Sequence, residues 1–381
     1  VIGDFAETPR YQGAGSSAVN SIKVDTFLEC LKESGLNSVG FATGFDRQGK
    51  PDAAKKAEAA ALAAKADVVL LCLGLDEIKE SEGLDRADMK LADNQIELLQ
   101  AVQQANPNTV VVLSAGASLE TPWLTHCKAL VYGALGGQAG AGAMVDVLTG
   151  KVNATGALAS AFVRDHQSIP AVQNVGGDYF ADYEIVCRND DPRYPGKEIG
   201  NIGTGSFGGA DTYNGGMYIV EAEGIYVGYK YYETRYFDAV MGQGNANSAA
   251  GATQGSAWNY GDEMLYTFGH GLSYLDYTQT IKSVTVDRSV NGNITAVVEV
   301  KNNSNQDGKF LTQLYVQQPY TDYDRTNLVE KSAVMFLNSA KVDVAAGKSK
   351  EVTITIPTKY LASYDANNAK TYIVDAGDYY F

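Results

Sequence analysis

Two hydrophobic patterns alternate along the first 165 residues. Continuous apolar runs are typical of strands that are buried on both faces. Longer stretches rich in good helix formers, with apolar residues on one face, are typical of helices. The strand-like runs lie at 68–75, 109–114 and 129–135, and the helical stretches lie at 53–66, 94–105 and 138–148. Apolar strands separated by helices predict an α/β sandwich, a mostly parallel sheet with flanking helices.

The last hundred residues follow a different pattern, in which apolar and polar positions alternate over short segments. Residues 294–300 and 351–356 are two clear examples. The dipeptides Asn291-Gly292 and Asp307-Gly308 mark turns between such segments. Short strands at this spacing predict an all-β antiparallel sandwich.

Residues 166–275 follow neither pattern. They contain Gly-Gly pairs and Asp-Pro turns, and the Gly/Asn/Ser/Ala-rich insertion from Met241 to Ser256 is typical of a flexible loop. Residues 225–232 are rich in Tyr and β-branched side chains and predict a structural strand. The predicted organisation is an α/β sandwich domain over 1–165, an irregular connecting region with an insertion over 166–275, and a β-sandwich over 276–381.

Composition and charge exclude several classes of protein. The formal net charge is −15 and no Lys/Arg cluster is present, so we expect no nucleic-acid partner. No apolar run approaches the ~18 residues of a membrane span, so we expect no membrane partner. The four cysteines lack CxxC spacing and predict buried free thiols. With only three histidines, we expect no metal ion and no other cofactor.

Candidate chemistry gathers in the acidic segment that follows the apolar run 68–75. It contains Glu80-Ser81-Glu82-Gly83-Leu84-Asp85-Arg86, and loops beyond the carboxyl ends of parallel strands are where α/β proteins place their sites. A carboxyl group held there can serve as a general acid or base. The plainer interpretation is a solvated acidic loop, with Asp85 and Arg86 as a local ion pair.

A second loop, Thr8-Pro9-Arg10-Tyr11-Gln12-Gly13-Ala14-Gly15-Ser16-Ser17, is rich in Gly and Ser. A phosphate cradle is one interpretation, but the GxGxxG pattern fails at Ala18 and no Walker lysine follows. The sequence therefore does not favour nucleotide binding.

Taken in order, these motifs resemble glycoside hydrolase family 3, particularly its β-glucosidases. The resemblance covers nearly the whole chain. The motifs that carry it are Thr8–Ser17, Glu80–Arg86, Glu223-Gly224-Ile225-Tyr226-Val227-Gly228-Tyr229, Phe268-Gly269-His270-Gly271-Leu272-Ser273-Tyr274, and Val300-Lys301-Asn302-Asn303 with Gln313-Leu314-Tyr315-Val316. The last of these is similar to the family's fibronectin-type-III-like domain.

The resemblance implies a retaining, exo-acting β-glucosidase with a site built from two domains. Glu82 stands at the general acid/base position, while an Asp nucleophile and most of the glucose subsite come from a (β/α)8 barrel. That nucleophile motif, an Asp flanked by Ser and Trp, does not occur in these residues. We therefore expect a larger enzyme whose barrel precedes or follows this segment. The expected substrate is a β-glucoside or cello-oligosaccharide.

Several assignments around the expected site stay open at the level of sequence. Arg10, Tyr11 and Gln12 are candidates to line the aglycone side or to stabilise the domain interface. Trp123 is expected in the core, whereas Trp258 fits either a core or a sugar platform. β-Xylosidase activity and a noncatalytic carbohydrate-binding or scaffold module are the alternatives to a β-glucosidase.

The insertion also bears on assembly. We expect it to contact the barrel or a second copy of the enzyme, which leaves a homodimer open. The compartment is unknown, with the cytoplasm slightly favoured because cysteines are few and this segment shows no signal peptide.

Overall fold

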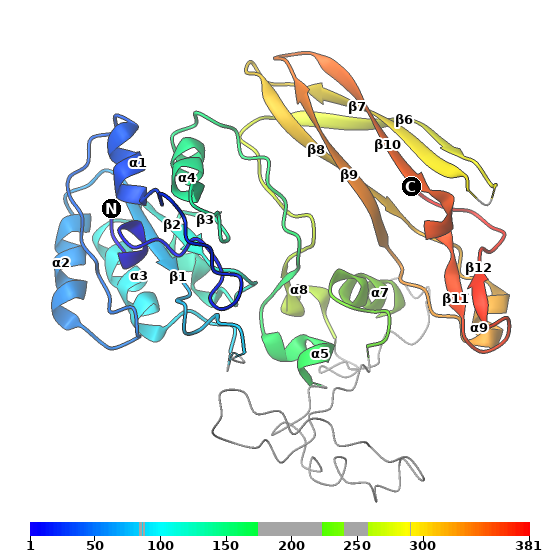
Figure 1. Cartoon of the computed structure of the whole chain (residues 1–381), viewed down its shortest axis with the longest axis horizontal. Helices are drawn as coiled ribbons and strands as arrows, with labels where there is room; N and C mark the ends of the chain where they lie inside the picture. Colours follow the sequence, from blue (N-terminus) through cyan, green and yellow to red (C-terminus); the bar gives the residue numbers. More distant parts are fainter. Residues whose placement is uncertain (84–85, 87, 174–222, 240–257, 290) are drawn as a thin grey trace, which may run out of the picture.

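The computed structural model places an α/β unit and a β-sandwich on either side of a connecting region (Figure 1). The residues it describes are 1–83, 86, 88–173, 223–239, 258–289 and 291–381. The predicted fold class is confirmed: a parallel sheet with flanking helices is followed by antiparallel β-structure. The predicted boundaries at 165 and 275 stay a prediction.

The sheet of the α/β unit is parallel. Its three strands, in the order β1-β2-β3, are β1 (Val69–Gly74), β2 (Thr109–Ser114) and β3 (Ala129–Tyr132). Ile2 extends it beyond β1 by parallel bridges to Leu71 and Ala42. Because the strands are parallel, the loops that follow them emerge at one edge of the sheet. The loop after β1 is the acidic segment singled out in the sequence.

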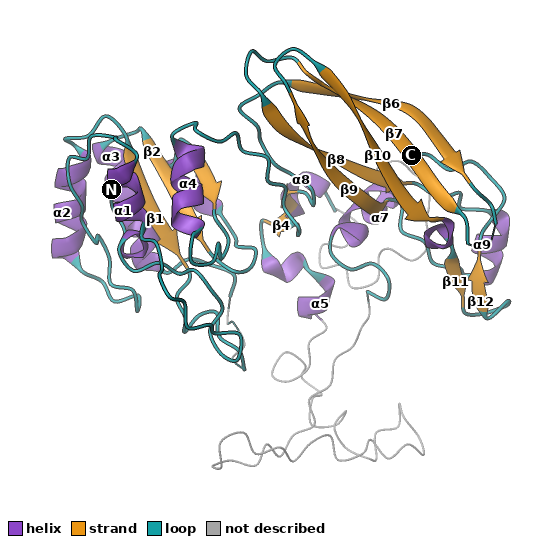
Figure 2. Ribbon diagram, turned by 45° about the horizontal axis from the view of Figure 1, so that its top comes forward, coloured by secondary structure: helices purple, strands orange, loops and turns teal. Residues whose placement is uncertain are grey.

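Helices flank this sheet in two pairs, α1 with α4 and α2 with α3 (Figure 2). Their bounds, with the short 3-10 helices, are η1 (Asp4–Ala6), α1 (Phe27–Glu33), α2 (Ala53–Ala63), α3 (Asp93–Ala105), η2 (Pro122–His126) and α4 (Gly140–Leu148). Local capping fixes two of their starts. Thr26 forms a capping box with Glu29 at α1, and the Asp52 carboxylate accepts from the amides of Ala54 and Lys55 at α2.

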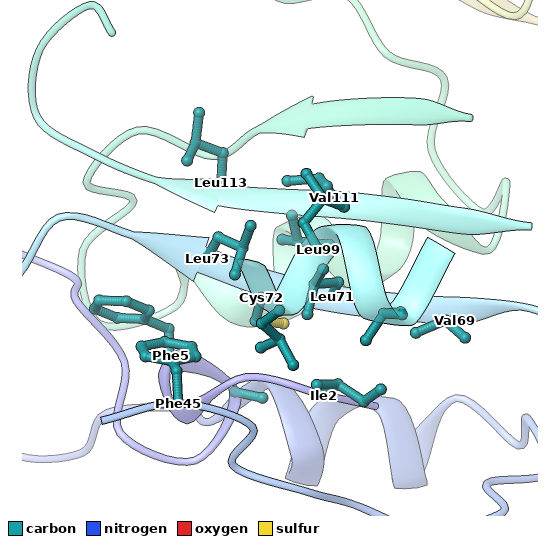
Figure 3. Close-up of a cluster of buried hydrophobic side chains, with 14 of the residues drawn as sticks. Ile2, Phe5, Phe45, Val69, Leu71, Cys72, Leu73, Leu99, Val111 and Leu113 are labelled. Atoms are coloured by element: carbon teal, nitrogen blue, oxygen red, sulfur yellow. The ribbon is translucent and has the colours of Figure 1, made fainter. Parts of the chain in front are cut away.

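The core of the α/β unit lies between the sheet and these helices (Figure 3). Leu71, Leu73, Leu99 and Val111 are completely buried there, each contributing on the order of 1.5–3 kcal/mol by burial. Trp123 is 2% exposed, which confirms its predicted place in the core.

A buried amide clip fixes the end of β1. Gln95 of α3 donates its Nε2 to the Gly74 carbonyl at 2.9 Å and accepts the Gly74 amide at 3.0 Å. A Cβ at Gly74 would lie 2.2 Å from the Ser114 carbonyl oxygen, so only glycine fits at this position. The clip and the close approach of β2 fix the point from which the acidic loop departs.

In its described part, the connecting region contains several short elements and one longer helix, α7. The elements are β4 (Phe162–Val163), η3 (His166–Ser168), α5 (Pro170–Gln173), α7 (Tyr229–Ala239), α8 (Tyr260–Glu263) and β5 (Met264–Tyr266). The predicted strand at 225–232 is wrong, because a turn leads there into α7. Gly224 and Gly228 have φ values of +53° and +61°, which interrupt an extended run. Helical spacing then buries Tyr231, Tyr232 and Arg235 together.

Trp258 joins this buried cluster instead of facing solvent. It is 8% exposed, and the Arg235 guanidinium lies 5.0 Å from its ring centroid. Of the two interpretations left open, the described structure therefore favours the core. The predicted insertion 241–256 lies outside the described residues.

The connecting region is anchored at both sides. On the side of the α/β unit, the amide of Leu158 donates to the carbonyl of His270 and the amide of Gly269 donates to the carbonyl of Leu158, both at 2.8 Å. Asn153 Nδ2 also donates to Ser273 Oγ at 3.0 Å. We call this pairing the neck, because the chain enters and leaves the connecting region there.

On the other side, α7 is bonded to the β-sandwich. Thr234 Oγ1 accepts the Ala333 amide and the Tyr229 hydroxyl accepts the Phe336 amide, both at 2.8 Å. The sandwich has a three-stranded sheet β10-β7-β6, a two-stranded sheet β8-β9 and a hairpin β11-β12. Its elements are β6 (Tyr277–Val286), β7 (Asn293–Asn302), β8 (Gly308–Val316), α9 (Asp322–Asn327), β9 (Met335–Val344), β10 (Ser349–Pro357), η5 (Thr358–Leu361), β11 (Ser363–Asp365) and β12 (Thr371–Ile373).

Alternating residues of these strands form the sandwich core. In β7, Ile294, Ala296, Val298 and Val300 are all buried, as a period of two requires. None of the helices in the described ranges is both long and apolar enough to cross a membrane. Cys30, Cys72 and Cys127 are free thiols, as predicted, but of these three only Cys72 is fully buried and the other two are half-buried. Cys187 lies outside the described residues.

Candidate active site

The acidic loop begins with a tight turn beyond β1. The Asp76 carboxylate accepts the amides of Ile78 and Lys79 at 3.0 and 2.7 Å, and the Asp76 carbonyl accepts the amide of Glu80. An Asp side chain that bonds the backbone two and three residues further on is a common way of reversing the chain. The loop therefore has a defined start.

Lys79 joins the two ends of the loop. Its Nζ lies 2.9 Å from Asp88 Oδ1 and 3.1 Å from the Lys90 carbonyl oxygen. Burial alone would raise the pKa of Asp88, but the bonds from Lys79 and from the Lys90 amide outweigh it, so that the pKa lies below its ordinary value. The loop is thus closed by an ion pair whose carboxylate stays ionised.

Glu80 turns inward and anchors the middle of the loop. Its Oε2 accepts the Gly116 amide, from the loop after β2, at 2.8 Å, and its Oε1 lies 3.8 Å from Arg86 Nη1. Arg10 Nη2 donates to the Glu80 carbonyl at 2.9 Å. The predicted ion pair of Arg86 with Asp85 involves a residue outside the described ranges. The described partner of Arg86 is Glu80.

Glu82 points the other way and is exposed. The segment Ala14–Ser16 holds it from one side, and we call this segment the clasp. Ala14 forms a parallel bridge with Ser81, the Glu82 amide donates to the Ala14 carbonyl at 3.0 Å, and the Ser16 amide donates to Glu82 Oε2 at 2.5 Å. Two loops far apart in sequence therefore present one carboxylate at the edge of the sheet.

The clasp approaches Glu82 closely because residue 15 is glycine. Gly15 has φ +117°, and a Cβ added there would lie 2.5 Å from both Cβ and Oε2 of Glu82. Neither the conformation nor the space admits a side chain.

The electrostatics of Glu82 in this chain favour its charged form. Hydrogen bonding by the Ser16 hydroxyl, and then by the Ser16 amide, lowers the pKa of Glu82, with a small opposing effect of burial. A desolvated domain interface or a neighbouring negative charge would have the opposite effect and raise this pKa. Among the described residues, the hydrogen bonds of Ser16 therefore stabilise the ionised form of the carboxyl group.

The other predicted site residues lie at the same edge of the sheet. Arg10 is 4% exposed, and its guanidinium donates a hydrogen bond to the Glu80 carbonyl. The half-buried Tyr11 accepts the Gly137 amide on its carbonyl and a bond from Gln12 Nε2 on its hydroxyl, at 3.0 Å. Gln12 also binds the backbone of Val19. These bonds stabilise the loop, and aglycone binding by the three residues stays a prediction.

Comparison with known proteins identifies the family of the chain. The family model described as the glycosyl hydrolase family 3 C-terminal domain matches residues 1–274, and that of the fibronectin type III-like domain matches residues 311–381.

The chain belongs to glycoside hydrolase family 3.

Relatives within family 3 are much longer than this chain. An exo-α-(1→6)-L-arabinopyranosidase of Bifidobacterium longum is 34% identical over 100% of this chain and 41% of its own length. The thermostable β-glucosidase B of Acetivibrio thermocellus is 31% identical over 100% of this chain and 42% of its own length. The crystal structure of a Bifidobacterium adolescentis family 3 β-glucosidase matches with a TM-score of 0.73 and 31% identity, covering 99% of this chain and 45% of that one. The chain thus spans about two fifths of the relatives it matches.

The clasp is the part of the candidate site that sequence reasoning missed. For the Gly/Ser loop the sequence offered a phosphate cradle, which its pattern did not support, and gave no other role to Ala14–Ser16, whereas in the structure this segment binds the Glu82 loop. The one usable signal was an isolated glycine flanked by small residues, which indicates close approach of another segment. It does not reveal which segment approaches.

One group of potential metal ligands occurs among the described residues. Oxygen and nitrogen atoms of Glu120, Asp165 and His166 lie within 4.8 Å of one another. Glu120 Oε1 is already bonded to His166 Nδ1 at 2.5 Å and to the His166 amide at 2.9 Å, and Lys90 Nζ lies 3.8 Å from Glu120 Oε2. We therefore treat these residues as a histidine–carboxylate pair and assign no metal to it.

Proposed function

We propose that this chain is the C-terminal part of a retaining, exo-acting β-glucosidase that removes terminal, non-reducing β-D-glucosyl residues. Glu82 is its general acid/base. The observation that carries the proposal is the position of Glu82: an exposed carboxylate at the carboxyl edge of the parallel sheet, within the family motif and bound by a second loop.

The chemistry requires two carboxyl groups about 5–5.5 Å apart in a retaining glycosidase. In the first step, an attacking carboxylate forms a bond to the anomeric carbon while Glu82 gives its proton to the departing glycosidic oxygen. In the second step, Glu82 takes a proton from water, which attacks the same carbon and releases the first carboxylate. Glu82 returns to its protonated form at the end of the cycle.

We assign the attacking carboxylate to a barrel domain outside these residues. The relatives are more than twice as long as this chain, which leaves room for a domain of barrel size. Docking of that domain would partly desolvate Glu82 and place a negative charge beside it. Both effects raise the pKa of a carboxyl group, which supplies the protonated form for the first step.

Specificity for the sugar is a finer matter than the class of reaction. The name of one relative specifies an arabinopyranosidase and that of another a β-glucosidase. Since we place most of the glycone subsite on the barrel, this chain supports β-glucosides, β-xylosides or arabinopyranosides equally by its own contacts. The alternative outside the enzymes is a noncatalytic carbohydrate-binding module. That function does not explain why a second loop binds one exposed carboxylate so closely.

The test uses the full-length enzyme with Glu82→Ala and, as a control, Glu58→Ala, an exposed residue on α2. Turnover of cellobiose should fall by about 10²–10⁴-fold in Glu82→Ala, because its leaving group needs protonation. The first step on 2,4-dinitrophenyl glucoside should suffer less, and added azide should restore part of the turnover. Wild-type rates on cellobiose in Glu82→Ala would refute the assignment. Nitrophenyl β-glucoside, β-xyloside and α-L-arabinopyranoside would define the glycone.

A further inference from the structure

Hydrogen bonds fix the backbone and the side chain of Glu80 at the carboxyl edge of the sheet. Its amide donates to the Asp76 carbonyl at 3.1 Å, and its carbonyl accepts from Arg10 Nη2 at 2.9 Å. Its carboxylate Oε2 accepts the Gly116 amide at 2.8 Å. A single residue separates Glu80 from Glu82, so the geometry at Glu80 sets the direction from which Glu82 starts.

The loop that meets Glu80 is itself held by the next strand. Tyr132, the last residue of β3, donates its hydroxyl to the Ala115 carbonyl at 3.0 Å. The adjacent Gly116 amide is the group that binds Glu80. Because β1, β2 and β3 are neighbours in one sheet (Figure 1), these contacts run across the carboxyl ends of all three strands. We call Tyr132, Ala115, Gly116 and Glu80 the brace.

We propose that Glu80 is a positioning residue that, through the brace, aims the Glu82 carboxyl group at the glycosidic oxygen. This inference rests on the proposed function, since it assumes that Glu82 is the acid/base. In the first step the Glu82 proton moves to that oxygen, the bond between this oxygen and the anomeric carbon breaks, and the attacking carboxylate bonds the carbon. The proton can move only when Glu82 lies within hydrogen-bond reach of the oxygen. A displaced Glu82 therefore slows those substrates whose leaving group must be protonated.

Two properties of the Glu80 carboxylate act on its surroundings, its hydrogen bond and its negative charge. The hydrogen bond to Gly116 has ordinary length, whereas the charge is partly offset by Arg86 Nη1, 3.8 Å from Oε1. The Glu80 side chain is only 11% exposed, so we assign it no contact with substrate. Gln in place of Glu80 keeps an oxygen acceptor and removes the charge, which separates the two effects.

The experiment compares Glu80→Ala, Glu80→Gln and Tyr132→Phe in the full-length enzyme, with Glu77→Ala as the control. Glu77 belongs to the same loop, but its exposed carboxylate pairs with Arg47 at 3.1 Å and not with the brace. The readout is kcat/KM for cellobiose divided by kcat/KM for 2,4-dinitrophenyl glucoside, whose leaving group needs no acid. Both constants report the first step, and their ratio does not depend on the fraction of active protein.

Glu80→Ala should lower this ratio about 10- to 100-fold, as a shift near 1 Å of a reacting group does. Glu80→Gln should stay within about threefold of wild type, because its amide oxygen still accepts the Gly116 amide. Tyr132→Phe keeps the ring that contacts Phe162 at 5.3 Å between centroids. It should lower the ratio about 2- to 10-fold, the effect of one lost hydrogen bond. Glu77→Ala should leave the ratio within about twofold.

A fall in both rate constants of Glu80→Ala at an unchanged ratio would show damage to the fold only and would overturn the inference. Equal losses in Glu80→Gln and Glu80→Ala would also overturn it, since the charge would then be the cause. If Glu80→Ala fails to fold, an unchanged ratio in Tyr132→Phe overturns it. These results leave the proposed function intact, whereas wild-type turnover of cellobiose by Glu82→Ala would refute the proposed function and the inference together.

Discussion

At the scale of single residues, the position of one carboxylate depends on a residue without a side chain. Gly15 combines a backbone conformation that other residues rarely adopt with a contact that leaves no room for Cβ. Glu80 and Glu82, two residues apart in one loop, consequently have opposite environments. Glu80 is anchored inward by Gly116, and Glu82 is held outward by the clasp.

We predict that Gly15→Ala displaces the Glu82 carboxyl group. In the full-length enzyme kcat/KM should fall about 10- to 100-fold, since a shift near 1 Å costs this much when a reacting group is misplaced. Gly35→Ala is the control, because Gly35 has φ +81° but nothing within 4 Å of its hypothetical Cβ. It introduces the backbone strain without the contact. Equal losses in the two variants would mean that strain alone, and not displacement of Glu82, causes the effect.

At the scale of elements, the site depends on how β1 ends. The Gln95 clip satisfies both backbone groups of Gly74, and these groups are buried where the strand gives way to the loop. A helix on one face of the sheet thereby determines where the Glu82 loop begins.

We predict that Gln95→Leu lowers the free energy of unfolding by about 1–3 kcal/mol, because it leaves the buried amide and carbonyl of Gly74 without partners. Gln100→Leu, a change of the same kind at an exposed position of α3, should alter it by less than about 0.5 kcal/mol. Urea unfolding followed by circular dichroism measures both. A neutral Gln95→Leu would show that water or a rearranged backbone satisfies Gly74.

The elements also show what sequence patterns can predict. The α/β unit and the β-sandwich were both predictable from the sequence. A strand that is buried on both faces needs a continuous apolar run, and a strand that is buried on one face needs alternating apolar and polar residues. The segment 225–232 was not, since Tyr, Ile and Val favour strands locally while two glycines with positive φ and the packing of α7 decide the outcome. For the site, the sequence predicts the loop and the candidate carboxylate. It cannot predict the clasp, which depends on a contact between residues 66 positions apart.

At the scale of the whole molecule, the chain holds one of the two carboxyl groups that our proposal requires. Its parallel sheet and its β-sandwich each have a buried core, so both are expected to fold without further segments.

We predict that purified residues 1–381 unfold cooperatively but do not hydrolyse nitrophenyl glycosides. Without an attacking carboxylate the covalent route is closed. Calorimetry and an overnight assay at high protein concentration measure the two properties. Glu82→Ala is the control for contaminating activity. Turnover that disappears in this variant would mean that the nucleophile lies within these residues.

The neck has a consequence for how such proteins change over evolution. Because Leu158 and Gly269 are bonded to each other, the intervening stretch leaves and returns at one point. The entropy of closing a loop grows only with the logarithm of its length, so doubling such a stretch costs roughly 0.6 kcal/mol. Insertions and deletions between the packed elements of this stretch therefore cost little free energy of folding, and they leave the sheet and the sandwich in place. We expect this stretch to be where lineages of the family differ most in length, and where a foreign domain can be grafted.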